Sequence, residues 1–167
     1  DAAGRLDWMR SRVYIETSVV SYASARLSRD LVTASRQRIT RRWLLLRDSA
    51  YQPCISDLVL REARRGDPVA AQRRLRLCES LPVIDITAQA ETLAARLIAS
   101  NAVPKQEAED ALHIALATTA GVDFLATWNF AHLVGASAKY RLMRAIEALG
   151  LRSPVLATPE ELYEELP

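Results

Sequence analysis

Carboxylate and amide side chains recur in this sequence at or near the ends of apolar runs. Glu16 directly follows one apolar run, Glu62 comes soon after another, Asp110 lies early in a helical segment, and Asn129 ends a third run. Their oxygens are the ligands that hard cations such as Mg²⁺ and Mn²⁺ prefer. Carboxylates that crowd together repel one another unless a cation neutralises them. We therefore expect a divalent-cation site with Glu16, Glu62 and Asp110 as its metal ligands.

The stretch 12–22, RVYIETSVVSY, indicates how the first of these acids is positioned. Residues 13–15 favour a buried strand, and Thr17 and Ser18 are good helix N-caps before a new apolar stretch. The pattern predicts a strand, an acid, a cap and a helix. In an open α/β sheet, ligands bind beyond the carboxyl ends of the strands, where Glu16 would lie. On this stretch alone, a solvated glutamate at a strand end is an equally good interpretation.

Strand and helix patterns alternate along the rest of the chain. Strands are expected at residues 13–16, 51–55, 81–86, 122–128 and 154–157. Helices are expected at residues 18–27, 28–49, 57–65, 68–80, 88–100, 104–120 and 137–149, and from 159 onward behind a capping box at Thr158 and Glu161. The alternation predicts an α/β fold with a mainly parallel sheet of about five strands, covered on both faces. Because proline lacks an N–H, Pro53 places its strand near a sheet edge or at a strand start.

The helix expected at residues 104–120 has the clearest boundaries, with Pro104 at its start and Gly121 just past its end. Asp110 lies in its first turns, where the positive end of the helix dipole favours the ionised carboxylate. His113, three residues further on, shares that helix face. Because it lies between two apolar neighbours, His113 is expected to be a packing residue rather than a ligand.

The length of 167 residues predicts one domain with a sizeable core. Residues 1–8 are expected to be a tag or an N-terminal extension, and residues 9–167 a single domain. Cys54 and Cys78 do not form a CxxC pair, so free thiols in a reducing cytoplasm are expected. No apolar run approaches the roughly 20 residues that span a bilayer, so we expect a cytoplasmic protein without a membrane segment.

Basic residues are concentrated in one part of the chain. Residues 26–76 contain 13 arginines and 5 acidic residues, a net charge of +8, whereas residues 77–167 carry a net charge of −6. A basic segment favours a polyanion or an acidic partner, and arginine suits bidentate phosphate contacts. The candidates for holding RNA are Arg36, Arg41, Arg42, Arg64 and Arg65. For any single arginine, a solvated helix face is the better interpretation.

Other common chemistries lack their motifs. The sequence has no GxGxxG or GxxxxGK[ST] phosphate loop and no GxSxG nucleophile elbow. Neither His113 nor His132 has the spacing of a zinc site.

Four segments, VYIETSVVSY, SDLVLREA, EDALHIALATTAGVDFLATWNFAHL and TPEEL, share a joint pattern. The pattern is a strand followed by acid-Thr-Ser, then Ser-x-x-x-x-x-Glu, then Asp-Ala-Leu-His, then Thr-Trp-Asn. It resembles the PIN-domain family and, within it, the VapC-like toxins of bacterial type II toxin–antitoxin pairs. The resemblance covers nearly the whole chain from about Arg12.

This resemblance implies a three-layer α/β/α fold and a Mg²⁺- or Mn²⁺-dependent ribonuclease site. Carried over by motif, the implied catalytic residues are Glu16, Glu62, Asp110, Asn129, Thr17, Ser18 and Thr127. It also implies a homodimer and a small antitoxin protein as partners. The chain departs from the family at two positions: the first acid is Glu16 instead of aspartate, and the fourth position is the uncharged Asn129.

Three functions were weighed. Metal-dependent hydrolysis of RNA leads. The alternative is a non-catalytic PIN-like module that binds RNA or protein through its arginines, and a metal titration separates the two. A phosphatase or phosphoacceptor domain is weaker, because no DxD-type pair follows the acid at the first strand end.

Overall fold

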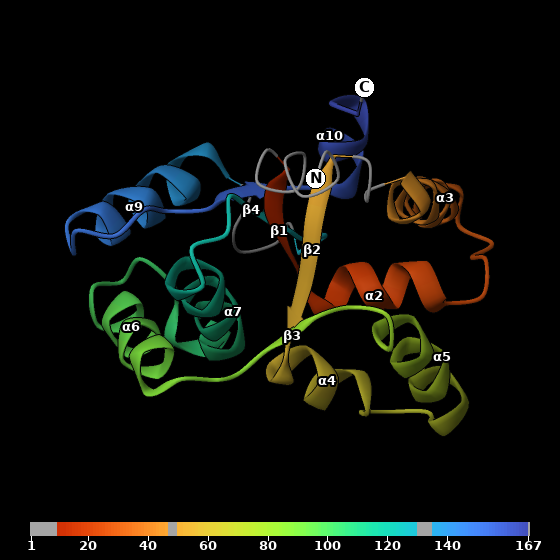
Figure 1. Ribbon diagram of the computed structural model, residues 1–167, viewed down its shortest axis with the longest axis horizontal. Helices are drawn as coiled ribbons and strands as arrows, with labels where there is room; N and C mark the ends of the chain where they lie inside the picture. Colours follow the sequence, from red (N-terminus) through yellow and green to blue (C-terminus); the bar gives the residue numbers. More distant parts are fainter. Residues whose placement is uncertain (1–9, 47–49, 130–134, 167) are drawn as a thin grey trace, which may run out of the picture.

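The computed structural model describes residues 10–46, 50–129 and 135–166, and within these ranges helices cover both faces of a five-stranded sheet (Figure 1). The sheet order is β3-β2-β1-β4-β5, and every pair of neighbours is parallel. The strands are β1 (Ser11–Ile15), β2 (Tyr51–Ser56), β3 (Val83–Ile84), β4 (Phe124–Ala126) and β5 (Val155–Ala157). The α/β fold with a five-stranded parallel sheet is therefore confirmed.

The helices form the outer two layers of this three-layer arrangement. On one side lie α6 (Ala88–Ala99), α7 (Ala108–Thr119) and α9 (Ala136–Glu147). On the other lie α2 (Thr17–Ser24), α3 (Leu31–Leu46) and α5 (Pro68–Cys78). Two short helices, α4 (Asp57–Ala63) and α10 (Pro159–Glu164), follow β2 and β5 directly.

Strand β1 is the centre of the sheet and of the core. It pairs with β2 on one side and β4 on the other, and Val13, Tyr14 and Ile15 are fully buried. Because all strands run the same way, their carboxyl ends meet at one edge of the sheet. The predicted burial of the first strand is confirmed.

Three helices begin where strands end, each with a side chain that caps the first turn. Glu16 caps α2, Ser56 caps α4, and Thr158 caps α10 in a capping box with Glu161. These caps satisfy amide groups that have no partner inside the helix. The capping box was predicted and is present.

The position of β2 differs from the sequence prediction. We expected Pro53 to lie near a sheet edge or at a strand start, but it is the third residue of β2, which lies between β1 and β3. The reason is that β3 is only two residues long and pairs with Ile55 and Ser56. At Pro53 the β3 side of β2 is therefore locally unpaired, and the missing N–H costs no ladder bond.

Several elements are shorter than predicted. The expected strand 122–128 is reduced to Phe124–Ala126, and the expected strand 81–86 to Val83–Ile84. The helix expected from Pro104 begins as a 3₁₀ turn, Lys105–Glu107, before α7. The long helix expected at residues 28–49 begins at Leu31, because Asp30 accepts a hydrogen bond from the Thr33 amide there. The end of that prediction, 47–49, and the expected N-terminal extension lie outside the described residues.

Candidate metal centre and active site

Four elements deliver polar side chains to the carboxyl edge of the sheet. Glu16 follows β1, Glu62 lies on α4, Asp110 and His113 lie on α7, and Asn129 comes three residues after β4. Asp110 lies in the first turn of α7, as the sequence predicted. The parallel topology thus places these groups near one another although they are far apart in the chain.

The carboxylate of Glu16 is held firmly by one of its oxygens. Oε2 accepts hydrogen bonds from the Ser18 amide at 3.0 Å, from the Ser18 hydroxyl and from the Thr127 hydroxyl at 2.9 Å. The residue is 8% exposed. The other oxygen, Oε1, lies 3.9 Å from Nε2 of His113.

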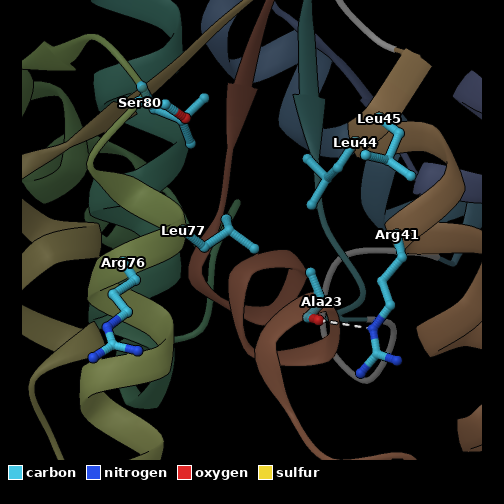
Figure 2. A pocket seen from close by; sticks show the side chains of 8 residues that line it. Ala23, Arg41, Leu44, Leu45, Arg76, Leu77 and Ser80 are labelled. Atoms are coloured by element: carbon cyan, nitrogen blue, oxygen red, sulfur yellow. Dashed lines mark hydrogen bonds between the residues drawn. The ribbon is translucent and has the colours of Figure 1, made fainter.

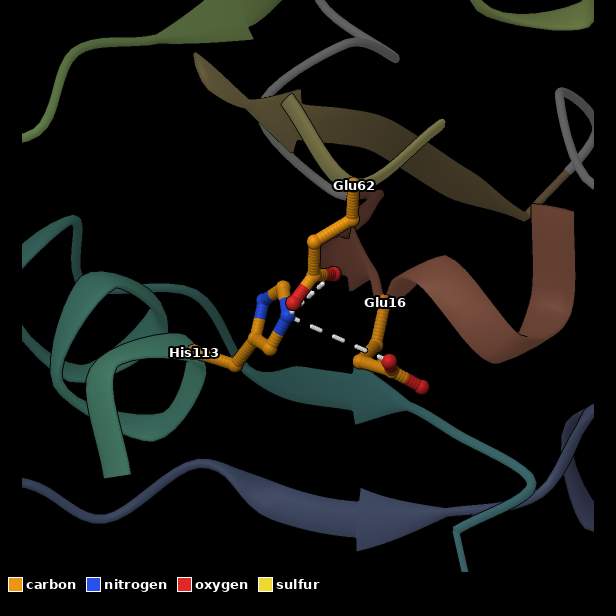
Figure 3. A group of neighbouring side chains, drawn as sticks. All are labelled: Glu16, Glu62 and His113. Carbon is orange, nitrogen blue, oxygen red and sulfur yellow. Dashed lines mark hydrogen bonds and ion pairs between the residues drawn. The ribbon is translucent and has the colours of Figure 1, made fainter. Parts of the chain in front are cut away.

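Glu62 and His113 form a close pair beside Glu16, and the three side chains point toward one another (Figure 3). Nε2 of His113 lies 3.0 Å from Oε2 of Glu62, which also accepts a hydrogen bond from the Thr17 hydroxyl. Burial by itself raises the pKa of Glu62, but the hydrogen bonds and charge of its neighbours outweigh burial, so the pKa lies below its ordinary value.

A second hydrogen-bonded layer fixes the His113 ring. Its Nδ1 lies 2.7 Å from the Tyr14 hydroxyl, which in turn lies 2.6 Å from Oγ of Ser56. All three residues are buried. Burial strongly raises the pKa of Tyr14, so the phenol stays neutral.

Asp110 and Asn129 form a separate pair at the edge of this cluster. Nδ2 of Asn129 donates to Oδ2 of Asp110 at 2.8 Å. The pKa of Asp110 is raised to about 6, first by burial and then by the negative charges of Glu16 and Glu107, against smaller opposing effects of Asn129 and His113. Such a crowded, partly desolvated carboxylate is typical of a site that binds a cation.

The donor set fits a divalent metal ion. Among the described residues, ligand atoms of Glu16, Glu62 and His113 lie within 4.8 Å of one another. Two carboxylates and an imidazole, with a third carboxylate nearby, match the ligands of Mn²⁺-type sites, and the carboxylates alone match those of Mg²⁺. The seven residues that the sequence singled out for catalysis lie in this one hydrogen-bonded group or beside it.

The structure adds three residues to this group that the sequence prediction did not place in it: His113, Tyr14 and Ser56. A usable signal was present for Tyr14, because it lies two residues before Glu16 in a strand, and alternate residues face the same side. Ser56 ends the neighbouring strand, and the register pairs Tyr14 with Cys54. The partners of His113 follow only from how α7 packs against the sheet.

The five candidate arginines have different surroundings. Arg41 donates to the carbonyl oxygens of Ala23 and Ala25, so its guanidinium holds the end of α2. Arg42 lies over the ring of Tyr163 at 5.8 Å, and Arg64 is an exposed residue at the C-terminal end of α4.

The other two arginines lie closer to the acids. Arg65 forms an ion pair with Glu109 at 2.7 Å and is within electrostatic reach of Glu62. Arg36 lies 5.5 Å from the ring centre of Trp128, the residue between Thr127 and Asn129. Among the five candidates, these two have neighbours that adjoin the acidic cluster.

An apolar groove of about 440 Å³ lies away from the acidic cluster, between α2, α3 and α5 (Figure 2). Its walls carry Leu44, Leu45 and Leu77, with Arg41 and Arg76 beside them. On α3, Leu45 is 82% exposed, whereas Leu44 is buried.

Solved structures of other proteins are similar in fold to this chain. Neither a protein-family model nor a curated protein matches this chain. A chain from the VapBC2 complex of Rickettsia felis, solved with a DNA fragment from its promoter, is 17% identical, with a TM-score of 0.57. The match covers 88% of this chain and 98% of that one.

The second similar structure is VapC20 of Mycobacterium tuberculosis, a toxin that cleaves the sarcin–ricin loop. It is 20% identical, with a TM-score of 0.50, and the match covers 68% of this chain and 86% of that one. At these identities the likeness concerns the fold, and the predicted VapC-like PIN fold is confirmed. Within the described ranges, no helix is both long and apolar enough to span a membrane.

Proposed function

We propose that this protein is a metal-dependent endoribonuclease and the toxin of a toxin–antitoxin pair. The observation that carries the proposal is the buried cluster of Glu16, Glu62 and His113, with Asp110 beside it, at the carboxyl edge of a VapC-like fold. Carboxylates that crowd together at this edge repel one another when no cation is bound, and a bound cation neutralises that repulsion.

The residues have distinct proposed roles. Glu16, Glu62 and Asp110 hold a Mg²⁺ or Mn²⁺ ion, which when bound supplies Lewis-acid activation of water and neutralises charge on the scissile phosphate. Water adds to phosphorus, the P–O bond to the leaving ribose oxygen breaks, and the proton that the water loses ends on that leaving oxygen.

The remaining residues of the proposed site keep the acids in place. Ser18 and Thr127 fix Oε2 of Glu16, Thr17 fixes Glu62, and Asn129 fixes Asp110.

The test is digestion of end-labelled RNA with Mg²⁺, with Mn²⁺ or with EDTA. We expect cleavage only with a metal, and loss of cleavage in Glu62→Gln, which removes a charge and keeps the shape. The matched control is Glu91→Gln on α6, an exposed acid away from the cluster, which should cleave like wild type.

The second candidate, a non-catalytic PIN-like binding module, predicts a different result. It would bind RNA equally well with EDTA and leave the strand intact under every metal condition. Intact RNA with metal bound to the wild-type protein would therefore refute the ribonuclease proposal.

The partner proposal rests on the likeness to a VapBC complex. We expect a cytoplasmic homodimer, with a sedimentation mass about twice the 18.6 kDa of the chain. We also expect an antitoxin that lays an apolar segment in the groove between α2, α3 and α5. Expression alone should slow bacterial growth, and Asp110→Ala should abolish that effect. A harmless wild-type protein would refute the toxin role and leave the ribonuclease role standing.

A further inference from the structure

His113 lies among the acids at a position that packing alone does not explain. The side chain is 3% exposed, and its Nε2 faces Glu62 at 3.0 Å and Glu16 at 3.9 Å. The nitrogen thus points into the space that the carboxylates surround (Figure 3).

The second layer lets this nitrogen act as a ligand. If Nδ1 carries the ring proton, it donates to the Tyr14 hydroxyl, and Tyr14 donates to Oγ of Ser56. In this arrangement Nε2 presents a lone pair toward the acids. Histidine ligands in metal sites are usually held through the other ring nitrogen in this way.

The spacing also suits shared ligation. Two ligands at right angles on an ion with bonds of about 2.1 Å lie roughly 3.0 Å apart, and opposite ligands lie roughly 4.2 Å apart. The separations of 3.0 and 3.9 Å from Nε2 to the two carboxylates fall at or between these limits.

We propose that His113 is a direct nitrogen ligand of the active-site cation, and that it makes the centre select Mn²⁺ over Mg²⁺. This inference rests on the proposed metal-dependent function and narrows it to one cation. Mg²⁺ demands oxygen ligands in near-ideal octahedral geometry, whereas imidazole binds later divalent metals more strongly. Tyr14 is a positioning residue that holds the ring in the ligating tautomer.

The rival arrangement has Nε2–H donating to Glu62, with the metal held by oxygen atoms alone. It predicts that Mn²⁺ and Mg²⁺ depend on His113 to the same small extent. The two arrangements are therefore separable by binding measurements that need no RNA.

The test compares Mn²⁺ and Mg²⁺ binding to the full chain by isothermal titration calorimetry. Wild type should bind Mn²⁺ at least about 10-fold more tightly than Mg²⁺. His113→Gln should weaken Mn²⁺ binding by about 10-fold or more and Mg²⁺ binding much less. The matched variant Asp110→Asn, which changes an oxygen ligand, should weaken both ions alike.

Electron spin-echo spectroscopy of the Mn²⁺-loaded protein gives a direct reading. We expect a coupling from a coordinated ¹⁴N in wild type that disappears in His113→Gln. Tyr14→Phe should keep the coupling and weaken Mn²⁺ binding by about 10- to 100-fold. Circular dichroism of each variant in EDTA checks that it folds.

Bound Mn²⁺ without a nitrogen coupling would overturn the inference, as would equal losses of Mn²⁺ and Mg²⁺ affinity in His113→Gln. In that case RNA cleavage by the wild-type protein would still support the proposed function. A nitrogen-coupled Mn²⁺ in a protein that leaves RNA intact would instead support the metal centre and refute the ribonuclease.

Discussion

The two carboxylate oxygens of Glu16 have different surroundings. Oε2 accepts three hydrogen bonds from Ser18 and Thr127, so Oε1 is left to face His113. The extra methylene of glutamate relative to aspartate does not leave this acid loose, because the three donors fix its position. The departure from the family pattern is therefore accommodated by local hydrogen bonds.

Asp110 should report the cost of ionising a buried carboxyl in the metal-free cluster, a cost that includes repulsion by Glu16 and Glu107. Its pKa in the folded protein is raised from 3.8 to about 6, so its ionisation destabilises the fold as the pH rises from 4 to 6. In EDTA, Asp110→Asn should therefore be more stable than wild type above pH 6, by about 1 to 2 kcal/mol because solvent screens part of the repulsion.

Urea unfolding of both proteins between pH 4 and pH 8 measures this effect. The stability difference should be smallest near pH 4, close to the pKa of 3.8 of the unfolded carboxyl, and should grow as the pH rises toward 6. Since asparagine can still accept the hydrogen bond from Asn129, a difference that does not change with pH would exclude charge repulsion as the cause.

Among the contacts between elements, one with α3 holds Trp128, which follows β4, in place. The indole N–H of Trp128 donates to the Thr40 hydroxyl at 2.8 Å, and its ring stacks on Tyr22 at 5.7 Å. The Trp128 amide also donates to Ser18. Thr127 and Asn129, on either side of Trp128, are thereby held against the two acids that they contact.

Two buried tryptophans allow a matched test of the hydrogen bond between Trp128 and Thr40. Trp128→Phe loses the hydrogen bond to Thr40, whereas no described residue accepts one from the indole N–H of Trp43. We expect Trp128→Phe to lower the free energy of unfolding by about 1 kcal/mol more than Trp43→Phe does. Chemical denaturation measures both, and equal losses would show that the Trp128 bond contributes nothing.

Across the whole molecule, basic residues are concentrated in one segment of the chain. The net charge is only +2, yet residues 26–76 carry +8. That segment includes α3, α4 and α5, and it contains Arg36 and Arg65, which flank the acidic cluster. If the acids hold a cation, arginines beside them can bind phosphates that the carboxylates alone would repel.

RNA binding should therefore weaken with salt, and Arg36 and Arg65 should account for part of that dependence. With single-stranded RNA in EDTA, changing both to glutamine should reduce the slope of log affinity against log salt by about 1.4. The matched control changes Arg141 and Arg144 on α9 to glutamine, exposed residues in the acidic half. Equal slopes in the two double variants would assign Arg36 and Arg65 to structure or to a protein partner.

The local features of this protein could be predicted from its sequence alone. The apolar run before Glu16, the caps at Ser56 and Thr158 and the first-turn position of Asp110 were predictable, because caps and strand patterns depend on neighbours within a few residues. The alternation of strands and helices then predicted the parallel sheet and the edge at which the acids meet.

Which atoms meet at that edge could not be predicted in the same way, because it depends on how the elements pack. His113 meets Glu62 and Tyr14 through packing of α7 against the sheet. Similarly, β2 became an inner strand because a distant two-residue strand pairs with it. Such contacts depend on side-chain directions and on the packing of segments far apart in sequence, and no local pattern encodes them.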